Sequence, residues 1–186
     1  MTSSGAAATD PNVQAIRESF GRVVYSHKTH EKAREITSRN ATLVKWINII
    51  LTALTSTSIV TTIFTNQKAL LYVSSILSTL TLAFIIFQLS FDPAKEAERH
   101  RSTALALWAI RENYIHLLAD IASNREGIDV PARRDELTDE VKKVYELAPN
   151  TSTKAYKQAQ KALKISEDMT FSNDEINAFL PDSLHL

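Results

Sequence analysis

The stretch that decides the fold is WINIILTALTSTSIVTTIFTNQKALLYVSSILSTLTLAFIIFQLSF, residues 46–91, which contains a single charged side chain, Lys68. Lys68 lies near the middle and separates two uncharged segments, 46–67 and 69–91, of 22 and 23 residues. At about 1.5 Å per helical residue, each segment reaches roughly 33 Å, slightly more than the ~30 Å hydrocarbon core of a bilayer. The sequence therefore predicts a transmembrane helical hairpin over residues 46–91.

The charged residues are concentrated outside this stretch. The chain has 21 basic and 21 acidic side chains, and all of them except Lys68 lie in the remaining residues. A net charge of zero gives no electrostatic footprint for a polyanion, so we predict no direct nucleic-acid binding. The chain has no cysteine, which excludes a disulfide framework and a thiolate metal site.

The basic residues beside the two segments predict their orientation. Membrane proteins carry an excess of Lys and Arg on the cytosolic side of their spans. Here the basic residues that precede the first segment or follow the second are Lys28, Lys32, Arg34, Arg39, Lys45, Lys95, Arg99, Arg101 and Arg111. The connecting turn has only Lys68. We therefore expect both termini to be cytosolic.

The rest of the chain has few helix breakers, since it contains only three Gly and five Pro in total. We expect an all-α integral membrane protein whose hairpin is continuous with long cytosolic helices and is followed by a C-terminal set of short helices. Two Asp–Pro pairs, at 10–11 and 92–93, are typical of an N-cap followed by a proline in the first helical turn. The expected regions are a disordered tail at 1–10, an N-terminal cytosolic helix at 11–45, the hairpin at 46–91, a cytosolic helix at 92–124 and a C-terminal partner or oligomerisation region at 125–186.

Within the C-terminal region, residues 127–131 are the clearest linker. Three shorter helices are predicted near 132–147, 152–167 and 173–179. The last is signalled by Ser172 and Glu175, which have the spacing of a capping box.

Both membrane segments carry polar side chains along one side. The first contains eight Ser or Thr residues, and placing it on a helical wheel at 100° per residue collects much of its polar content on one stripe. Polar residues of the second segment recur at steps of four, three and seven. The candidate residues for a pore or a helix interface are Asn48, Thr52, Thr55, Thr62, Asn66, Ser74, Ser78, Thr81 and Gln88. Asn48 and Gln88 are expected at similar depth, near the cytosolic side.

Two interpretations of these stripes remain open. Hydroxyl and small side chains allow helices to approach closely and to hydrogen-bond, at about 0.6–2 kcal/mol for each bond. Alternatively, several hairpins assemble with the stripes turned inward, so that hydroxyl and carboxamide groups line a wet path. No ionisable residue lies in either stripe, which argues against a proton relay or an ion-coupled transporter.

The sequence offers no convincing catalytic or metal site. His27, His30 and Glu31 have a spacing that could place ligands on one side of a helix, but neighbouring lysines favour a solvated face. His116 and Asp120 are four residues apart, which favours a helix-surface pair over an acid–base couple. We predict no catalytic residue, no metal, no cofactor and no enzymatic activity.

Several segments together resemble a known family, the SLATT proteins, which are two-span membrane effectors of bacterial conflict systems. The segments are YSHKTHEKA at 25–33, DPAKEAERHR at 92–101 and ALWAIRENYIHLLADI at 106–121. The tail, with RRDEL at 133–137, VYELAPNTSTKAYKQAQKALK at 144–164 and TFSNDEINAFLPDSL at 170–184, resembles the subgroup that occurs with reverse transcriptases. The resemblance extends over residues 13–184.

The resemblance implies a pore-forming or membrane-disrupting effector that stays inactive until infection is signalled. We therefore expect a homo-oligomeric effector that permeabilises the bacterial inner membrane in antiphage abortive infection. It also implies a protein partner encoded nearby, which is a reverse transcriptase, a cyclic-nucleotide synthase or a nucleotide sensor. The chain shows no ligand-binding domain of its own, which argues against direct nucleotide sensing. Two alternatives stay open: a membrane-anchored scaffold that recruits or restrains a cytosolic enzyme, and a soluble bundle with the apolar hairpin buried inside it.

Overall fold

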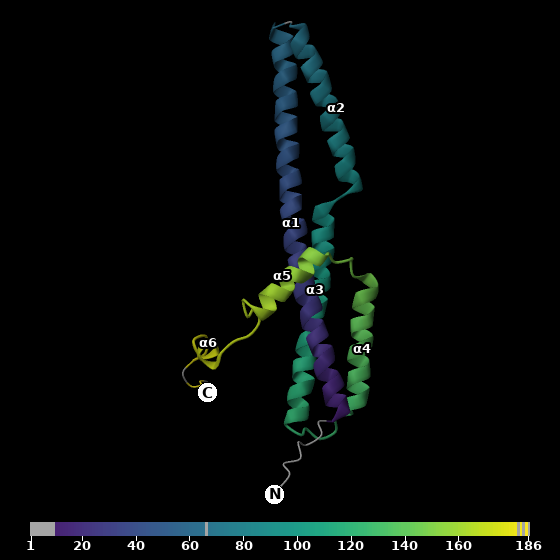
Figure 1. The fold of residues 1–186 in the computed structure, drawn as a ribbon, viewed down its shortest axis with the longest axis vertical. Helices are drawn as coiled ribbons and strands as arrows, with labels where there is room; N and C mark the ends of the chain where they lie inside the picture. Colours follow the sequence, from purple (N-terminus) through teal and green to yellow (C-terminus); the bar gives the residue numbers. More distant parts are fainter. Residues whose placement is uncertain (1–9, 66, 182, 184, 186) are drawn as a thin grey trace.

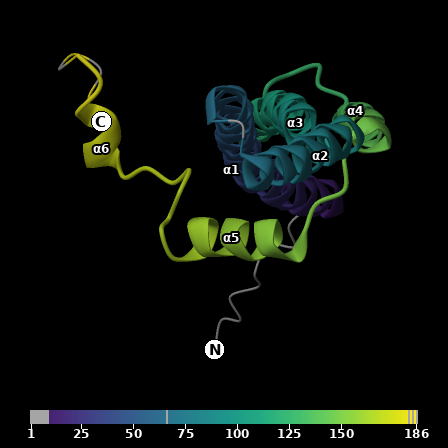
Figure 2. The ribbon, with the colours of Figure 1, turned by 90° about the horizontal axis from the view of Figure 1, so that it is seen from above.

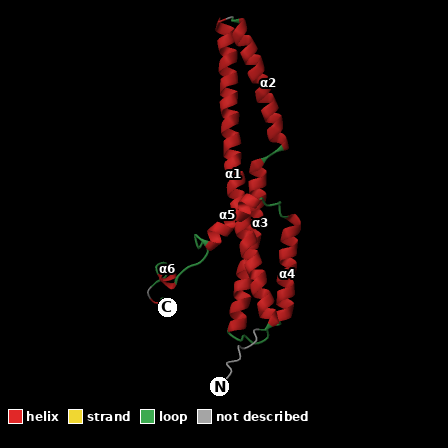
Figure 3. Cartoon of the chain, viewed as in Figure 1, coloured by secondary structure: helices red, strands yellow, loops and turns green. Residues whose placement is uncertain are grey.

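The fold is all-α, as the sequence predicts. A computed structural model describes residues 10–65, 67–181, 183 and 185, and no strand occurs among them. Figure 3 shows the helices and the short connections between them. The helices are α1 at Pro11–Thr65, α2 at Lys68–Ser90, α3 at Pro93–Ala122, α4 at Val130–Leu147, α5 at Thr153–Lys164 and α6 at Asn173–Asn177.

Helix α1 is a single element of 55 residues that joins the expected N-terminal helix to the first membrane segment (Figure 1). Asp10 caps it, because its Oδ1 accepts a hydrogen bond from the backbone N–H of Asn12 at 2.8 Å. No proline interrupts the helix after Pro11. At about 1.5 Å per residue, α1 is roughly 80 Å long.

The return path is divided into two helices. Phe91 and Asp92, between α2 and α3, have non-helical backbone angles, with φ −128° and ψ 88° at the first. The carboxylate of Asp92 accepts hydrogen bonds from two backbone N–H groups in the first turn of α3, at 3.0 and 3.1 Å. This confirms the N-cap that the Asp–Pro pair predicts. Figure 1 shows α2 diverging from α1 between the turn and this break.

Helices α1, α3 and α4 pack together on the other side of this break and contain the hydrophobic core. Its buried members are Ile16, Val23, Leu107, Ile110, Tyr114, Leu117 and Leu137. Helix α5 lies across α1, as Figure 2 shows from above, and buries three alanines against the bundle, Ala155, Ala159 and Ala162. These small side chains permit a close approach. We call the packed parts of α1 and α3, residues 12–39 and 93–123, the stalk.

Helix α4 begins two residues earlier than expected. Asp129 is its N-cap, accepting from the backbone N–H of Ala132 at 3.0 Å, so Pro131 lies in the first turn and not in the linker. The preceding loop reverses direction at Gly127, whose φ of +79° suits a residue without a Cβ.

The predicted capping box before α6 is confirmed. Ser172 Oγ accepts from the backbone N–H of Glu175 at 3.2 Å, and Glu175 Oε2 accepts from the backbone N–H of Ser172 at 2.8 Å. Both α5 and α6 are shorter than expected, and α6 lies away from the bundle (Figure 1). Of the expected disordered tail, residues 1–9 lie outside the described residues.

Candidate functional site

The hairpin formed by the distal part of α1 and by α2 presents an apolar outer surface. The described chain contains two helices long and apolar enough to cross a membrane, and their most apolar windows are only 0% and 6% buried. Large side chains such as Phe64 and Leu89 are more than four-fifths exposed. The soluble-bundle alternative is therefore wrong for this chain, because the hairpin is not covered by other parts of it.

The inner face of the hairpin is joined by hydroxyl groups. Thr62 Oγ1 lies 3.1 Å from Ser74 Oγ, and Thr55 Oγ1 lies 2.9 Å from Thr81 Oγ1. Each hydroxyl also lies within 2.9 Å of a backbone carbonyl in the preceding turn of its own helix. A hydroxyl has one proton, so in each pair only one member can donate across while the other donates along its helix.

These two pairs fix an antiparallel register with heptad spacing. The second pair lies seven residues before the first on α1, at 55 and 62, and seven residues after it on α2, at 81 and 74. The same step leads to Asn48 and Gln88, which supports the expectation that they lie at similar depth. We call these three layers, Thr62/Ser74, Thr55/Thr81 and Asn48/Gln88, the hairpin seam.

The third layer of the seam has no hydrogen bond between its members. Asn48 Oδ1 and Gln88 Nε2 are both buried atoms without a hydrogen-bond partner among the described residues. One is an acceptor and the other is a donor, so they are complementary. By sequence they lie far from the turn between the two helices, since Gln88 is two residues before the end of α2.

The remaining candidate residues lie in different surroundings. Ser78 is half-buried beside the seam, whereas Thr52 is exposed. On a wheel at 100° per residue, the residues of α1 that face α2 centre between Thr55 and Leu51, and Thr52 lies to one side of them. The polar stripe predicted from the sequence of the first membrane segment therefore includes one residue, Thr52, that α2 does not cover. Asn66 lies outside the described residues.

Two histidines of α1 are buried in the stalk, which corrects the expectation of a solvated face. His27 and His30 are 7% and 4% exposed, and His30 faces His100 of α3, which is 2% exposed. They continue the spacing of the core positions Ile16 and Val23, but the polar residues between them obscure this periodicity in the sequence.

The histidines make specific hydrogen bonds across the stalk. His27 Nδ1 donates to the backbone carbonyl of Ala104 at 2.9 Å, and the Nδ1 atoms of His30 and His100 lie 3.0 Å apart. Carboxylates lie at the edge of this cluster, with Glu31 3.8 Å from His27 Nε2 and a glutamate of α3, at position 96, 3.8 Å from His100 Nε2.

Burial controls the protonation of this cluster. It is the largest cause of the lowered pKa of His30, and together with positive charge on His100 and His27 it brings that pKa to about 4. Burial also lowers the pKa of His100; Glu96 opposes this shift and Arg99 adds to it. Both rings of the pair are therefore neutral at neutral pH, and one Nδ1 donates while the other accepts.

The other pair considered from sequence does not form a reactive couple. His116 is exposed, and Asp120 forms an ion pair with Arg125 at 3.1 Å. In the part of the chain that the structure describes, no group of three or more His, Cys, Asp or Glu side chains could hold a metal ion.

The comparisons with known proteins agree with the two-span architecture. Residues 13–175 match the model of one protein family, the SMODS and SLOG-associating 2TM effector domain family 4. No curated protein and no solved structure matches the chain. The match covers most of the sequence, and its two-span description agrees with the two exposed apolar helices. The chain is therefore a membrane protein that belongs to the SLATT family of two-transmembrane effector domains.

Proposed function

We propose that this protein is a non-enzymatic effector of a bacterial antiphage system, which oligomerises and permeabilises the inner membrane when an associated protein signals infection. Its family description supports an effector role and an association with SMODS and SLOG proteins. A nucleotide synthase, a nucleotide sensor or the reverse transcriptase expected from the C-terminal motifs would supply the signal. Both termini face the cytosol in this proposal, because the basic residues flank the spans on that side.

One face of α1 carries the argument for oligomerisation. Thr52 and Ser56 are exposed, four residues apart, and neither hydroxyl has a hydrogen-bond partner among the described residues. Together they form a small-xxx-small pair, a spacing that lets membrane helices approach closely. Large apolar side chains, Ile49, Ile59 and Ile63, flank the pair at heptad spacing and are also exposed. We call these five residues the outer face of α1.

The bilayer makes this face unfavourable when it is left uncovered. A hydroxyl without a partner loses hydrogen bonds when it moves from water into hydrocarbon, at a cost of about 1–3 kcal/mol in proteins. A second copy of the chain, or water enclosed between copies, would restore those bonds. The hydrogen bonds of the hairpin seam lie within a single chain, so its hydroxyls are already engaged, whereas those of Thr52 and Ser56 remain available for contacts between copies.

Activation would pass through the stalk. Because α1 is continuous from the stalk to the outer turn, a change in its packing against α3 also moves its membrane part. In the open assembly, such a movement would bring polar groups of the outer face and of the hairpin seam to a shared, hydrated centre.

The decisive experiment removes the outer-face hydroxyls. The double variant Thr52→Leu, Ser56→Leu should insert normally but lose both oligomerisation and permeabilisation, measured by cross-linking in membranes and by a membrane-potential dye. The matched control is Thr57→Leu, because Thr57 is also exposed and its hydroxyl also has no partner among the described residues, but it lies on another side of α1. A membrane potential that holds with the wild-type chain under every activating condition would refute the pore.

A membrane-anchored scaffold that recruits or restrains a cytosolic enzyme is the second candidate. It is favoured by uncovered apolar side chains in the C-terminal region, where Leu147, Ile165 and Phe179 are each more than 70% exposed. Replacing residues 46–91 with an unrelated two-span anchor separates the two functions, because a scaffold would keep its activity and a pore-forming effector would lose it.

A further inference from the structure

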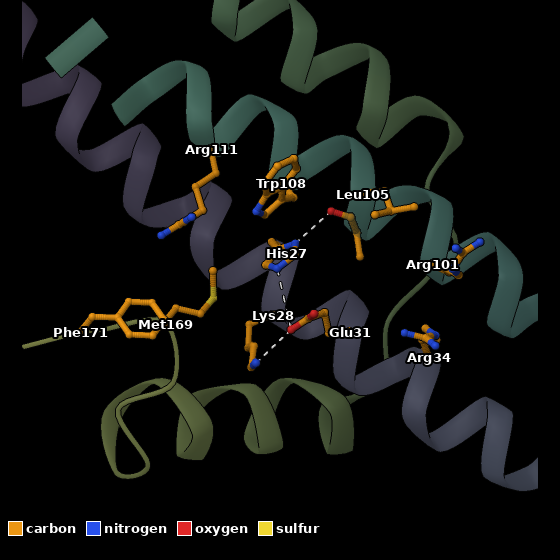
Figure 4. Close-up of a pocket in the computed structure, with 11 residues that line it drawn as sticks. His27, Lys28, Glu31, Arg34, Arg101, Leu105, Trp108, Arg111, Met169 and Phe171 are labelled. Atoms are coloured by element: carbon orange, nitrogen blue, oxygen red, sulfur yellow. Dashed lines mark hydrogen bonds and ion pairs between the residues drawn. The ribbon is translucent and has the colours of Figure 1, made fainter. Parts of the chain in front are cut away.

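A cavity of about 590 Å³ opens on the side of the stalk, away from the membrane hairpin. Its walls come from α1, from α3 and from the segment between α5 and α6, which contributes Met169 and Phe171. Figure 4 shows the side chains that line it. The proposed function above does not use this cavity.

The cavity is rich in positive charge. Arg34, Arg101, Arg111 and Lys28 line it, and Glu31 is its one acidic lining residue in the described chain. That carboxylate is already engaged, because it lies 2.9 Å from Lys28 Nζ and 3.8 Å from His27 Nε2. Lys28 also pairs with Asp168, Arg101 pairs with Glu98 and Arg111 with Glu112. The capacity to bind an anion therefore rests chiefly on Arg34 and on the unused donor of Arg111.

Two of the arginines retain unused hydrogen-bonding capacity. The guanidinium of Arg34 has no ion pair or hydrogen bond with any described residue; its backbone carbonyl accepts from Thr37 Oγ1. Arg111 pairs with Glu112 through Nη1, but its buried Nε has no hydrogen-bond acceptor. An unpaired guanidinium donor of this kind is suited to the oxygen atoms of a phosphate.

Flat apolar side chains lie between and beside these charges. Trp108 is 49% exposed and Phe171 is 67% exposed, so both rings present a surface that a planar group can stack on. In Figure 4, Arg111 lies at one end of the cavity and Arg34 and Arg101 at the other, with Trp108 between them. This order suits a ligand in which a planar ring is linked to phosphate groups.

The segment that closes one side of the cavity is tethered and strained. Asp168 forms an ion pair with Lys28 at 3.0 Å, which fixes the segment to α1. The residues on either side of it, Glu167 and Met169, have φ values of +51° and +72°. A left-handed conformation costs a residue with a side chain roughly 1–2 kcal/mol, and strain of this kind is concentrated at ligand-binding segments.

The position of the cavity argues against a lipid headgroup as the occupant. Arg34 precedes the first membrane segment by 12 residues and His27 by 19, which at 1.5 Å per residue places the cavity roughly 18–28 Å from the membrane segment along α1. The headgroup layer is only about 5–8 Å thick on each side. The occupant therefore reaches the site from the cytosol.

We infer that the stalk cavity is a binding site for a nucleotide, with the arginines holding its phosphates and Trp108 and Phe171 contacting its base. No separate ligand-binding domain is needed, which reverses the expectation that we drew from the sequence. Because the ligand would contact both helices of the stalk and the tethered segment, its binding would change their packing. The further step, from this change in packing to permeabilisation of the membrane, rests on the proposed function; binding itself does not.

The test measures binding directly on the full-length protein in phosphatidylcholine nanodiscs. The probes are adenosine triphosphate and a cyclic adenosine dinucleotide, compared with tripolyphosphate, which lacks a ring, and adenosine, which lacks phosphate. At least one of the two nucleotides should saturate the site, and both partial probes should bind more weakly. Loss of one charge-assisted contact in Arg34→Gln should weaken nucleotide binding by roughly tenfold.

Matched variants separate this site from general effects of charge and stability. Arg22→Gln removes an exposed arginine of α1 outside the cavity and should leave affinity unchanged. Trp108→Ala should weaken binding, whereas Phe179→Ala, which removes an exposed ring outside the cavity, should not. Absence of saturable binding by both nucleotides at millimolar concentration, or equal binding of tripolyphosphate, would overturn the inference. A requirement for phosphatidylglycerol in the nanodiscs would also overturn it, because it would identify a lipid as the ligand. None of these readouts depends on pore formation.

Discussion

The Nδ1 atoms of His30 and His100 lie 3.0 Å apart, in a hydrogen bond that joins the two helices of the stalk. This bond requires at least one neutral ring, because two protonated imidazoles would direct N–H groups at one another. The pair therefore connects the packing of α1 against α3 to pH.

The first prediction concerns the pH dependence of stability. The pKa of His30 is lowered to about 4 in the folded chain, against 6.5 for the ordinary side chain. The unfolded chain therefore binds more protons between these values, so stability is present above pH 6.5 and is lost as the pH falls toward 4. We expect the free energy of unfolding of the stalk to fall by about 2 kcal/mol between pH 7 and pH 5. Thermal unfolding in detergent, followed by circular dichroism, measures this change. In His30→Asn, whose side chain does not titrate, the free energy of unfolding should depend less steeply on pH. An unchanged dependence on pH would show that other groups titrate instead.

The second prediction concerns the hydroxyl pair at the centre of the hairpin seam. Thr55→Val and Thr81→Val each keep the shape of the side chain but remove its hydroxyl, so a double-mutant cycle should give a coupling energy of about 0.6–1.7 kcal/mol. Thr79→Val is the matched control, because Thr79 also bonds to the carbonyl of its own preceding turn, at 3.0 Å, but is exposed. Coupling of Thr55 to Thr79 as strong as to Thr81 would contradict the register.

The third prediction concerns the Asn48/Gln88 layer of the hairpin seam, whose two members do not hydrogen-bond to each other. Asn48 Oδ1 and Gln88 Nε2 are buried without partners, and each such group costs about 1–3 kcal/mol. Replacing both residues with Leu should therefore raise the unfolding temperature of the hairpin in detergent. A fall in that temperature would indicate that the two side chains bond to each other, or to a neighbouring copy, in the membrane.

The fourth prediction separates insertion from activity. The triple variant Asn48→Leu, Thr55→Leu, Thr62→Leu should still insert, since Leu favours the bilayer by roughly 0.3–0.6 kcal/mol per residue. It should not be toxic, because it lacks the polar groups that α1 contributes to the hairpin seam, and we assign the seam to the open assembly. Protease protection measures insertion, and growth after induction measures toxicity. If the triple variant remains toxic, these side chains serve only in packing.

Local patterns were enough to predict much of the architecture. The two uncharged segments predicted the hairpin. The Asp–Pro pairs and the Ser172/Glu175 capping box predicted where helices begin, because each of these patterns depends on residues close in the chain. The polar stripes also found the four hydroxyls that join α1 to α2.

Features that depend on distant segments could not be predicted in this way. The burial of His30 depends on its contact with His100, 70 residues later, and the polar neighbours of His30 obscured its place in the core periodicity. The exposure of Thr52 depends on the rotation of α1 relative to α2, which a helical wheel of one segment does not contain. The arginine-rich cavity likewise requires α1, α3 and the segment after α5 to meet.

The two legs of the molecule differ mechanically. One leg is the uninterrupted α1, so torque applied to its cytosolic end is transmitted as far as the outer turn. The other leg is interrupted at Phe91 and Asp92, whose backbone angles are non-helical, so α2 and α3 do not form one continuous rod. In the function that we propose, gating would proceed by movement of α2 about this break against the continuous α1, and stiffening residues 91–92 would lock the hairpin in whichever state it occupies.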